Sequence, residues 1–384
     1  MHAFQLHWSE LDGWLSDSEQ PASPGLVLYF GSREVLGRAA PYAALRTQFP
    51  VADIIGCSTG GQMADGDVSD QILTALALDF THTPLRLAST TVADPEHSHD
   101  AGAAIGSDLA ADDLAGVFVL SDGLHINGSA LVEGIVSAVG LHVPVSGGLA
   151  GDGADFVETL VGGNDIPKSR TVVAIGFYGT AIQLGHGSAG GWDVFGPKRK
   201  ITAARGNVLL EVDGKPALDL YKLYLGDEES QKLPGSALLF PMRISDPRHP
   251  DRAVVRTVLS IDATAGSMTF AGDMPKGWTA QLMRGSVGRL CAGAAEATHH
   301  AAAAMDDGEQ TGDSAAIFVS CIGRRLLMGQ RIDEEIEAAT AELPANCRTV
   351  GFYSYGEIAP HDGSGACQLH NQTMTVTLLR ERAA

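Results

Sequence analysis

Short apolar runs bounded by glycine recur along the chain, and longer segments with helical spacing of apolar residues separate them. Short apolar runs are typical of buried strands, whereas apolar residues every three or four positions predict helices. We therefore expect strands at 25–31, 51–56, 71–80, 116–120, 143–146, 171–178, 315–320, 348–353 and 372–379. We expect helices at 35–49, 94–113, 129–139, 280–305 and 333–341.

The order of these elements repeats three times. In each repeat a strand is followed by a helix and then by two more strands, starting near residues 25, 116 and 315. Such a repeat indicates a chain built from similar supersecondary units. We predict an α/β (α+β) fold with mixed, largely antiparallel sheets and repeated β-α-β-β units flanked by helices.

A different pattern lies between the second and third repeats. Residues 201–217 have the pattern of a hairpin with Asp213-Gly214 at its turn, and a helix through Tyr221 and Tyr224 follows. Three further strands are expected at 238–243, 253–261 and 267–270. Gly, Trp and Pro cluster at 190–200, so we place a domain boundary there and divide the chain into residues 1–195 and 196–384.

Three glycine-rich turns follow strands at similar places in the repeats, within residues 55–62, 144–152 and 350–358. Glycine there permits positive φ or close backbone approach, and N–H groups in such turns can hold an anion. We interpret the turns as the framework of a ligand site. The candidate ligand-binding residues are Cys57, Ser58, Thr59, Gly60, Gly147, Gly148, Asp152, Arg324, Tyr355, Gly356, Glu357, His370 and Asn371.

Composition narrows the class of partner. With 45% hydrophobic and 19% charged residues, the chain of 384 residues is expected to fold around a substantial core. A formal net charge of −20 argues against nucleic acid or an anionic membrane surface as the partner. There is no signal-peptide pattern and no apolar run of about 18 residues. The five cysteines form no Cys-x-x-Cys pair, so we expect reduced thiols and a cytoplasmic protein.

Several stretches, in this order, together resemble the FIST family. The matching residues are 56–61, 147–152, 191–192, 206–207, 211–217, 221, 321–324, 351–358 and 370–373. The resemblance extends from about residue 25 to the C-terminus. It implies a FIST N-terminal region at 1–195 and a FIST C-terminal region at 196–384.

The resemblance also implies a function. FIST proteins are sensory proteins of signal transduction that bind small ligands, and this chain resembles the stand-alone bacterial branch of NosP-type nitric-oxide sensors. That branch implies haem as a cofactor, NO as the ligand and a histidine kinase or a cyclic-di-GMP enzyme as the partner. Haem iron needs an axial ligand such as His, and the alternative candidates are His125, His186 and His370.

Two other functions remain open. The first is a haem-free FIST module that binds a small metabolite such as an amino acid. The second is an enzyme with Cys57 as nucleophile, completed by His370 and Glu357. The other two turns carry Gly148 and Tyr353 at the place of Cys57, so we favour a packing role for the thiol and expect no catalytic residue.

Two hypotheses for the role of Arg324 follow from the sequence. Its planar guanidinium could hold an anionic ligand, or it could form a structural ion pair with Glu357.

Overall fold

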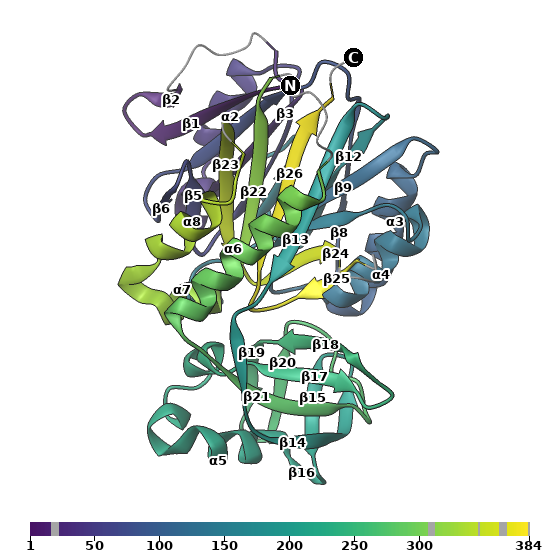
Figure 1. The fold of residues 1–384 in the computed structure, drawn as a ribbon, viewed down its shortest axis with the longest axis vertical. Helices are drawn as coiled ribbons and strands as arrows, with labels where there is room; N and C mark the ends of the chain where they lie inside the picture. The colour runs from purple at the N-terminus through teal and green to yellow at the C-terminus, as the bar shows by residue number, and fades with distance from the viewer. Residues whose placement is uncertain (17–22, 306–311, 345, 361–366, 383–384) are drawn as a thin grey trace.

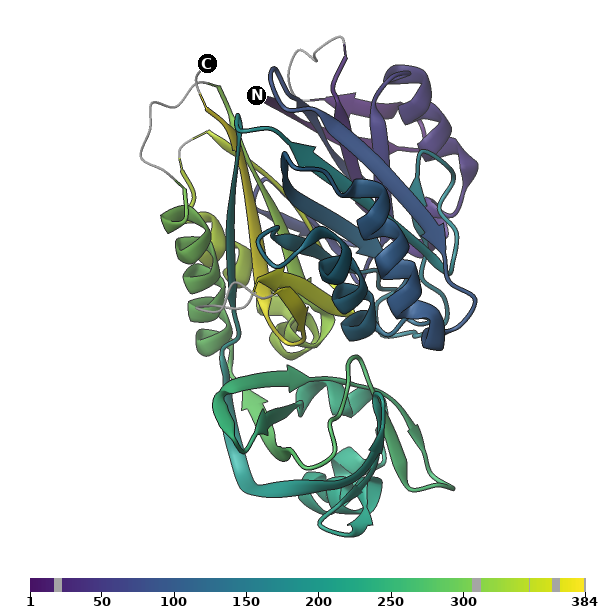
Figure 2. The same ribbon diagram turned by 90° about the vertical axis from the view of Figure 1, so that its right-hand side faces the viewer.

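The computed structural model describes residues 1–16, 23–305, 312–344, 346–360 and 367–382. These residues form two bodies (Figure 1). The larger one, the three-sheet body, contains residues up to Gly191 and again from Ser286, whereas residues 192–285 form a smaller inserted β domain. Both termini lie at the end of the three-sheet body that is remote from the inserted domain (Figures 1 and 2), where the Met1 amino group pairs with Glu381 at 3.1 Å.

The three-sheet body contains the predicted unit three times. The first unit has strands β1 (His2–Ser9), β3 (Leu26–Gly31), β4 (Asp53–Ser58) and β7 (Thr74–Asp79). The second has β8 (Leu85–Thr91), β9 (Leu114–Ser121), β10 (Val145–Leu149) and β12 (Thr171–Tyr178). The third has β13 (Ile182–Ala189), β22 (Ser314–Cys321), β23 (Cys347–Ser354) and β26 (Met374–Glu381).

The three units share one topology. Their strands are ordered β4-β3-β7-β1, β10-β9-β12-β8 and β23-β22-β26-β13. The first pair in each order is parallel, and the other neighbours are antiparallel. The predicted α+β fold with mixed, largely antiparallel sheets and repeated units is therefore confirmed.

Each unit also contributes strands to the sheet of another unit. The hairpin of β5 (Gln62–Ala64) and β6 (Asp67–Ser69) leaves the first unit and pairs with β23. From the second unit, β11 (Val161–Gly163) pairs with β4. From the third, β24 (Gly356–Pro360) and β25 (Cys367–His370) extend the sheet at β10. The exchange is cyclic, so the three units are interlocked, and β2 (Gly13–Ser16) completes the first sheet beside β1.

The three sheets enclose one core. Leu28 and Phe30 of β3 pack in the same apolar cluster as Phe118 of β9 and Phe352 of β23. The alternate residues Val27 and Tyr29 belong to a second cluster on the outer face of the first sheet. Because β3 is buried on both faces, its sequence is a continuous apolar run rather than an alternating one.

Helices cover the outer faces of the sheets. The first sheet carries α1 (Arg33–Leu36) and α2 (Ala39–Gln48). The second carries α3 (Ser98–Leu109), which follows the short helix η1 (Pro95–His97), and α4 (Gly128–Val139). The third carries α6 (Val287–Ala303), α7 (Ile322–Met328), η3 (Gly329–Arg331) and α8 (Asp333–Thr340), with α6 lying along β13 and β26 (Figure 1).

The inserted β domain is built around its own core. Its strands are β14 (Trp192–Arg205), β15 (Val208–Val212), β16 (Lys215–Pro216), β17 (Met242–Asp246), β18 (His249–Arg256), β19 (Val258–Asp262), β20 (Ser267–Phe270) and β21 (Thr279–Gly285). Helices α5 (Ala217–Ser230) and η2 (Gly235–Leu239) complete it. Buried Ile201, Tyr221 and Phe270 lie in a cluster of this domain alone. The division of the chain at residue 195 stays a prediction; residues 287–382 share a body with residues 1–190.

Several expected elements differ from the observed ones. The helix expected at 280–305 begins only at Val287, because Thr279–Gly285 alternates between buried and half-buried residues as strand β21. The helix expected at 35–49 is two helices, with Gly37 ending the first. The strand expected at 238–243 starts only at Met242 as β17, since residues 238–239 end the helix η2, and the strand expected at 253–261 is divided between β18 and β19. Asp213-Gly214 turns between β15 and β16, as expected.

Candidate functional site

The three glycine-rich turns meet where the units exchange strands. The N–H of Gly60 donates to the Tyr353 carbonyl at 2.8 Å, and the N–H of Tyr353 donates to the Gly61 carbonyl at 2.8 Å. The N–H of Gly151 donates to the Ser58 carbonyl at 3.0 Å. Each turn is thus bonded to a turn of another unit, and the turns form one framework.

Close packing explains two of the glycines. At Gly147, where φ is +136°, an added Cβ would lie 1.9 Å from the Val119 carbonyl oxygen. At Gly151 it would lie 3.2 Å from both the Gly60 nitrogen and the Tyr353 oxygen. Gly147 therefore has to be glycine, whereas a side chain at Gly151 would require small shifts of its neighbours. The N–H groups of Gly60 and Gly151 donate to protein carbonyls. They therefore stabilise the framework and are not available to bind an anion.

A polar pocket of about 290 Å³ opens beside this framework. It lies between the first turn, the loop after β10 and the start of α7. Its lining residues are Ser32, Arg33, Glu34, Thr59, Gly60, Gly61, Gln62, Asp70, Asp152, Gly153, Ala154, Asp155, Ile322, Arg325 and Leu326. Hereafter it is called the turn pocket. All three units contribute to it.

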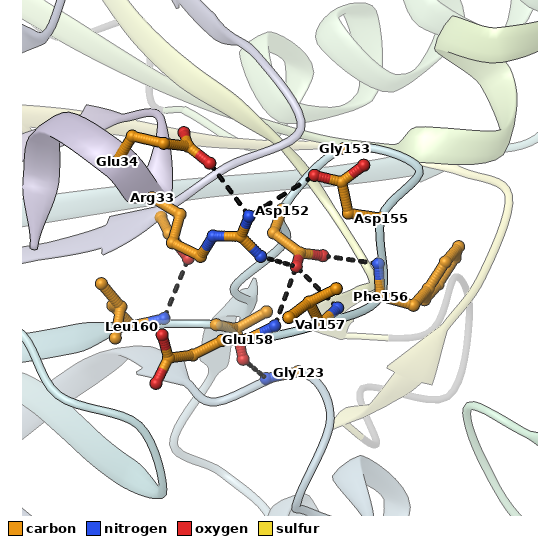
Figure 3. A network of polar contacts seen from close by, with 12 residues as sticks. Arg33, Glu34, Gly123, Asp152, Gly153, Asp155, Phe156, Val157, Glu158 and Leu160 are labelled. Carbon is orange, nitrogen blue, oxygen red and sulfur yellow. Dashed lines mark hydrogen bonds and ion pairs between the residues drawn. The ribbon is translucent and has the colours of Figure 1, made fainter.

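Asp152 is the centre of the hydrogen bonding on one side of the turn pocket (Figure 3). It accepts hydrogen bonds from the N–H groups of residues 156, 157 and 158 at 3.1, 2.8 and 2.9 Å. Its carboxylate pairs with Arg33 at 2.8 Å and accepts a hydrogen bond from the Tyr355 hydroxyl. Asp152 is buried, so these donors compensate its charge and fix the loop that follows.

Arg325 forms the opposite side of the turn pocket. Its Nη1 and Nη2 each lie 2.6 Å from an oxygen of Asp70, so the ion pair is bidentate. Nη1 also donates to the Gly60 carbonyl, and the guanidinium lies 5.3 Å from the centre of the Tyr353 ring. The side chain of Asp70 is 64% exposed and that of Arg325 is 19% exposed. The guanidinium is therefore held in place by a carboxylate that water can readily replace.

The turn pocket carries both signs of charge. Two arginines, Arg33 and Arg325, face four carboxylates, those of Glu34, Asp70, Asp152 and Asp155. Asp155 and Glu34 both lie beside the Arg33 Nη2, at 3.5 and 3.0 Å, and both are largely exposed (Figure 3). The pocket can thus bind a cationic and an anionic group of one ligand at once.

Cys57 and Ser58 lie inside the framework rather than in the pocket. Cys57 is fully buried in the central core, and burial raises the pKa of its thiol well above the ordinary value. The thiolate needed for nucleophilic attack is therefore disfavoured at neutral pH. The strand register places Cys57, Gly148 and Tyr353 at equivalent positions of the three units. Ser58 Oγ accepts a hydrogen bond from the Leu160 N–H at 2.9 Å.

Glu357, Gly148 and His370 lie side by side across three strands. Glu357 pairs with Gly148 of β10 and with His370 of β25 in the sheet register. Its buried carboxylate accepts hydrogen bonds from Ser354 Oγ at 2.6 Å and from the N–H and Oγ1 of Thr373 at 3.1 and 2.9 Å. Burial raises the pKa of Glu357 to about 7, against these hydrogen bonds, which lower it.

This buried carboxylate predicts a pH-dependent stability. The folded pKa lies above the ordinary 4.5, so the folded state keeps a proton that the unfolded chain loses between pH 4.5 and about 7. Stability should therefore fall as the pH rises through this window. Glu357→Gln should remove the decline and be the more stable protein at pH 8, by on the order of 3 kcal/mol. The amide can still accept from Thr373 and donate to Ser354.

Urea unfolding at pH 5, 6, 7 and 8 would measure this effect. Glu34→Gln, which changes an exposed carboxylate, is the matched control and should keep the wild-type profile. Parallel profiles for wild type and Glu357→Gln would show that Glu357 does not titrate in this window.

Arg324 is not in the turn pocket. It is fully buried and pairs with Glu335 of α8 at 2.6 Å, which replaces the predicted partner Glu357. It also donates to the Leu290 carbonyl at 2.8 Å and to the carbonyls of Gly190 and Gln372. Glu335 accepts further hydrogen bonds from Ser320 and Tyr353, at 3.2 and 3.0 Å. Arg324 therefore holds the chain where it leaves for the inserted β domain and returns.

The three candidate histidines lie apart from the turn pocket. His125 contacts the buried carboxylate of Asp122 through Nδ1 at 3.2 Å. The Nε2 of His370 lies 3.2 Å from the Ala359 carbonyl. Both ring nitrogens of His186 are buried, with no hydrogen-bond partner among the described residues. Burial lowers the pKa of His186 to about 4, so its imidazole is neutral.

The sequence predicted some of the residues that line the turn pocket but not the others. Among the candidates, Thr59, Gly60 and Asp152 line it, and Tyr355 supports it through Asp152. Asn371 donates to the Tyr355 carbonyl at 3.4 Å, so it contacts Tyr355 and does not line the pocket itself. The charged lining residues that the sequence did not indicate are Arg33, Glu34, Asp70, Asp155 and Arg325. Arg33 and Arg325 follow the carboxyl ends of β3 and β22, the strand ends at which α/β proteins bind ligands, and that position was the available signal.

The described residues contain no group of three or more His, Cys, Asp or Glu side chains placed to hold a metal ion. In the same part of the chain, no helix has both the length and the apolar character needed to cross a bilayer.

Three interlocked units, an inserted β domain and a pocket at the strand exchange define an α+β protein with a candidate binding site. The FIST N domain matches residues 25–215, and the FIST C domain matches residues 217–360. The chain belongs to the FIST family. FIST domains are sensory, ligand-binding domains of signal transduction. No curated protein matches the chain.

Proposed function

We propose that this protein is a sensory module that binds a small zwitterionic metabolite, such as a free amino acid, in the turn pocket. The observation that supports the proposal is the pairing of two arginines with four carboxylates around about 290 Å³. A purely anionic ligand would meet an excess of negative charge, whereas a zwitterion satisfies both signs. Sensory FIST domains bind small ligands, and a free amino acid is of suitable size.

The geometry suggests how such a ligand would bind. Its carboxylate would take the place of the exposed Asp70 on the Arg325 guanidinium, whose fork suits two oxygens. Its ammonium group would lie near Asp155 and Glu34 on the other side. Asp152 and Tyr355 would keep that loop in position without contacting the ligand charge directly.

Signalling requires that binding change a surface seen by another protein. Because all three units contribute to the turn pocket, a bound ligand bridges all of them. A ligand shifts a conformational equilibrium only through its different affinity for the two states. A histidine kinase or a cyclic-di-GMP enzyme in the cytoplasm is the partner that we propose for this output.

Nitric oxide sensing through a bound haem is a second candidate function, and one residue supports it. The turn pocket does not fit haem, since its walls are charged and its lining residues include no His, Cys or Tyr. His186 alone has the chemistry of an axial ligand, as a neutral imidazole with both nitrogens unpartnered among the described residues. A stoichiometric Soret band that is lost in His186→Ala would favour this candidate, and absence of the band would remove it.

A thermal-shift screen tests the proposed function. The full chain would be heated with each of the twenty common amino acids at millimolar concentration. At least one should raise Tm by several degrees, because a ligand of the folded state at 100 times its Kd stabilises by about 2.7 kcal/mol. The N-acetyl and amide derivatives of the same amino acid are the controls and should give no shift. A screen without any shift would count against the proposal.

A further inference from the structure

A second cavity lies where the inserted β domain meets the three-sheet body. Its volume is about 520 Å³, and it shares no lining residue with the turn pocket. It lies between helix α4, strand β25 and the end of strand β18. Its lining residues are Ser129, Val132, Glu133, Val136, Ser137, Gly140, Leu141, Arg256, Cys367, Gln368 and Leu369. Hereafter it is called the α4 pocket.

Arg256 is the only cationic residue among those lining residues, and it is 6% exposed. Its Nε donates to the Asp273 carbonyl at 3.3 Å, and its Nη1 donates to the carbonyls of Val255 and Leu369 at 3.1 Å each. Among the described residues, Nη2 has no hydrogen-bond partner and the guanidinium has no carboxylate at ion-pairing distance. The negative charge of Asp273 raises the pKa of Arg256, but the Asp273 carboxylate accepts its hydrogen bond from Asn127, at 2.8 Å.

A buried cation held only by carbonyl groups is costly. Burial lowers the pKa of Arg256 to about 10, so the guanidinium stays charged at neutral pH while lacking a direct counter-charge. The hydroxyl of Ser129 adds a second polar group, because its buried Oγ has no partner among the described residues. Ser129 lies in the first turn of the twelve-residue helix α4, whose N–H groups at residues 129 and 130 donate to the side chain of Asn127, so the helix contributes its dipole there rather than free donors.

Apolar side chains make up much of the remaining wall. Val132, Val136 and Leu141 follow one another along α4 and its end, and Leu369 lies opposite them on β25. Glu133 is at the exposed rim, where solvent screens its charge. Burial raises the pKa of the Cys367 thiol, so this residue stays neutral and adds no negative charge. The pocket therefore has one anion-binding end and one apolar end.

We propose that the α4 pocket is a second ligand site, specific for an organic monocarboxylate with an aliphatic chain. The carboxylate pairs with the free Nη2 edge of Arg256 and accepts a hydrogen bond from Ser129, and the chain lies along α4 against Leu369. Because Arg256 belongs to the inserted β domain and α4 to the three-sheet body, the ligand joins the two bodies. The site is independent of the turn pocket and of any ligand bound there.

Calorimetric titration of the full chain with sodium octanoate tests this proposal. Octanamide and octylamine, which keep the chain but lose the negative charge, are the matched ligands. Octanoate should bind at least about tenfold more tightly than either, because a hydrogen bond to a charged group is worth more than a neutral one. Across butanoate, hexanoate and octanoate, the affinity should rise about three- to fourfold per methylene.

Variants separate the contributions of the pocket. Arg256→Gln should weaken octanoate about tenfold or more, and Ser129→Ala by a few fold. Val136→Glu, which adds negative charge to the apolar wall, should weaken it as well. Arg243→Gln removes a guanidinium from the neighbouring strand β17 and should bind as wild type does. If Arg256→Gln does not fold, Ser129→Ala and Val136→Glu still decide the question.

Any one of three results would overturn the proposal. They are equal affinity for octanoate and octylamine, unchanged octanoate binding by Ser129→Ala and Val136→Glu, and no binding of octanoate at millimolar concentration. Arg325→Gln in the turn pocket should leave octanoate binding unchanged, so failure here and failure of the proposed amino-acid site are distinguishable.

Discussion

Replacing Arg324 by methionine is expected to destabilise the protein by about 3–5 kcal/mol, because it leaves the buried carboxylate of Glu335 without its counter-charge. The same change removes the donors that bind the carbonyls of Leu290, Gly190 and Gln372. Urea unfolding at neutral pH, followed by circular dichroism, would measure the loss. The fully buried position of both side chains is what makes the expected effect large.

A surface pair provides the matched control. Arg331 and Glu334 form an equally short bidentate pair, at 2.6 and 2.7 Å, but the side chain of Arg331 is 60% exposed. Arg331→Met should therefore cost no more than about 1 kcal/mol. The double variant Arg324→Met, Glu335→Leu should be less destabilised than Arg324→Met alone, since it leaves no unpaired buried charge. If Arg324→Met lowers the free energy of unfolding no more than Arg331→Met does, the structural role of Arg324 is contradicted.

Arg325→Gln is expected to weaken the amino acid identified by thermal shift by about 100-fold, because two charge-assisted hydrogen bonds to the ligand carboxylate are lost. Arg325→Lys should recover only part of the affinity, since a single ammonium cannot reproduce the planar fork. Arg348→Gln removes another partly exposed guanidinium, one that pairs with Asp65 at 3.0 Å outside the pocket, and should bind normally. Calorimetric titration of the three variants would measure these differences.

Asp70→Asn gives a result of the opposite sign. Asp70 holds the Arg325 guanidinium in the ligand-free protein and so competes with the ligand carboxylate. Its neutralisation should raise the affinity by a few fold, whereas Asp155→Asn should lower it by loss of the partner for the ammonium group. Equal affinity in wild type, Arg325→Gln and Asp70→Asn would place the ligand elsewhere.

The repeated units were predictable because their central strands are buried on both faces. In β3, β9 and β22 the apolar runs are continuous, and a predicted helix follows each along the chain, although the short helix α7 between β22 and α8 was not predicted. The outer strands of the three units, β1, β8 and β13, were not predicted, since they contain exposed or half-buried positions and, in β13, glycine at every second place of its centre. The exchange of β5, β11 and β24 between units depends on pairing across long sequence separations, which local pattern does not encode.

The candidate site shows the same limit. Asp152 and Gly60 were selected because each belongs to a glycine-rich turn, and the structure brings them to one pocket. Arg325 and Asp70 are 255 positions apart and meet only because the β5–β6 hairpin crosses to the third sheet. Arg324, its sequence neighbour, points instead to Glu335, since successive residues of a short helix face different directions.

A crystal structure of the protein with the amino acid that gives the largest thermal shift would show where this ligand binds. The ligand should lie in the turn pocket, with its carboxylate on Arg325, Asp70 displaced, and its ammonium group near Asp155. Density for the ligand in the α4 pocket or elsewhere, with the Asp70–Arg325 pair intact, would contradict this expectation.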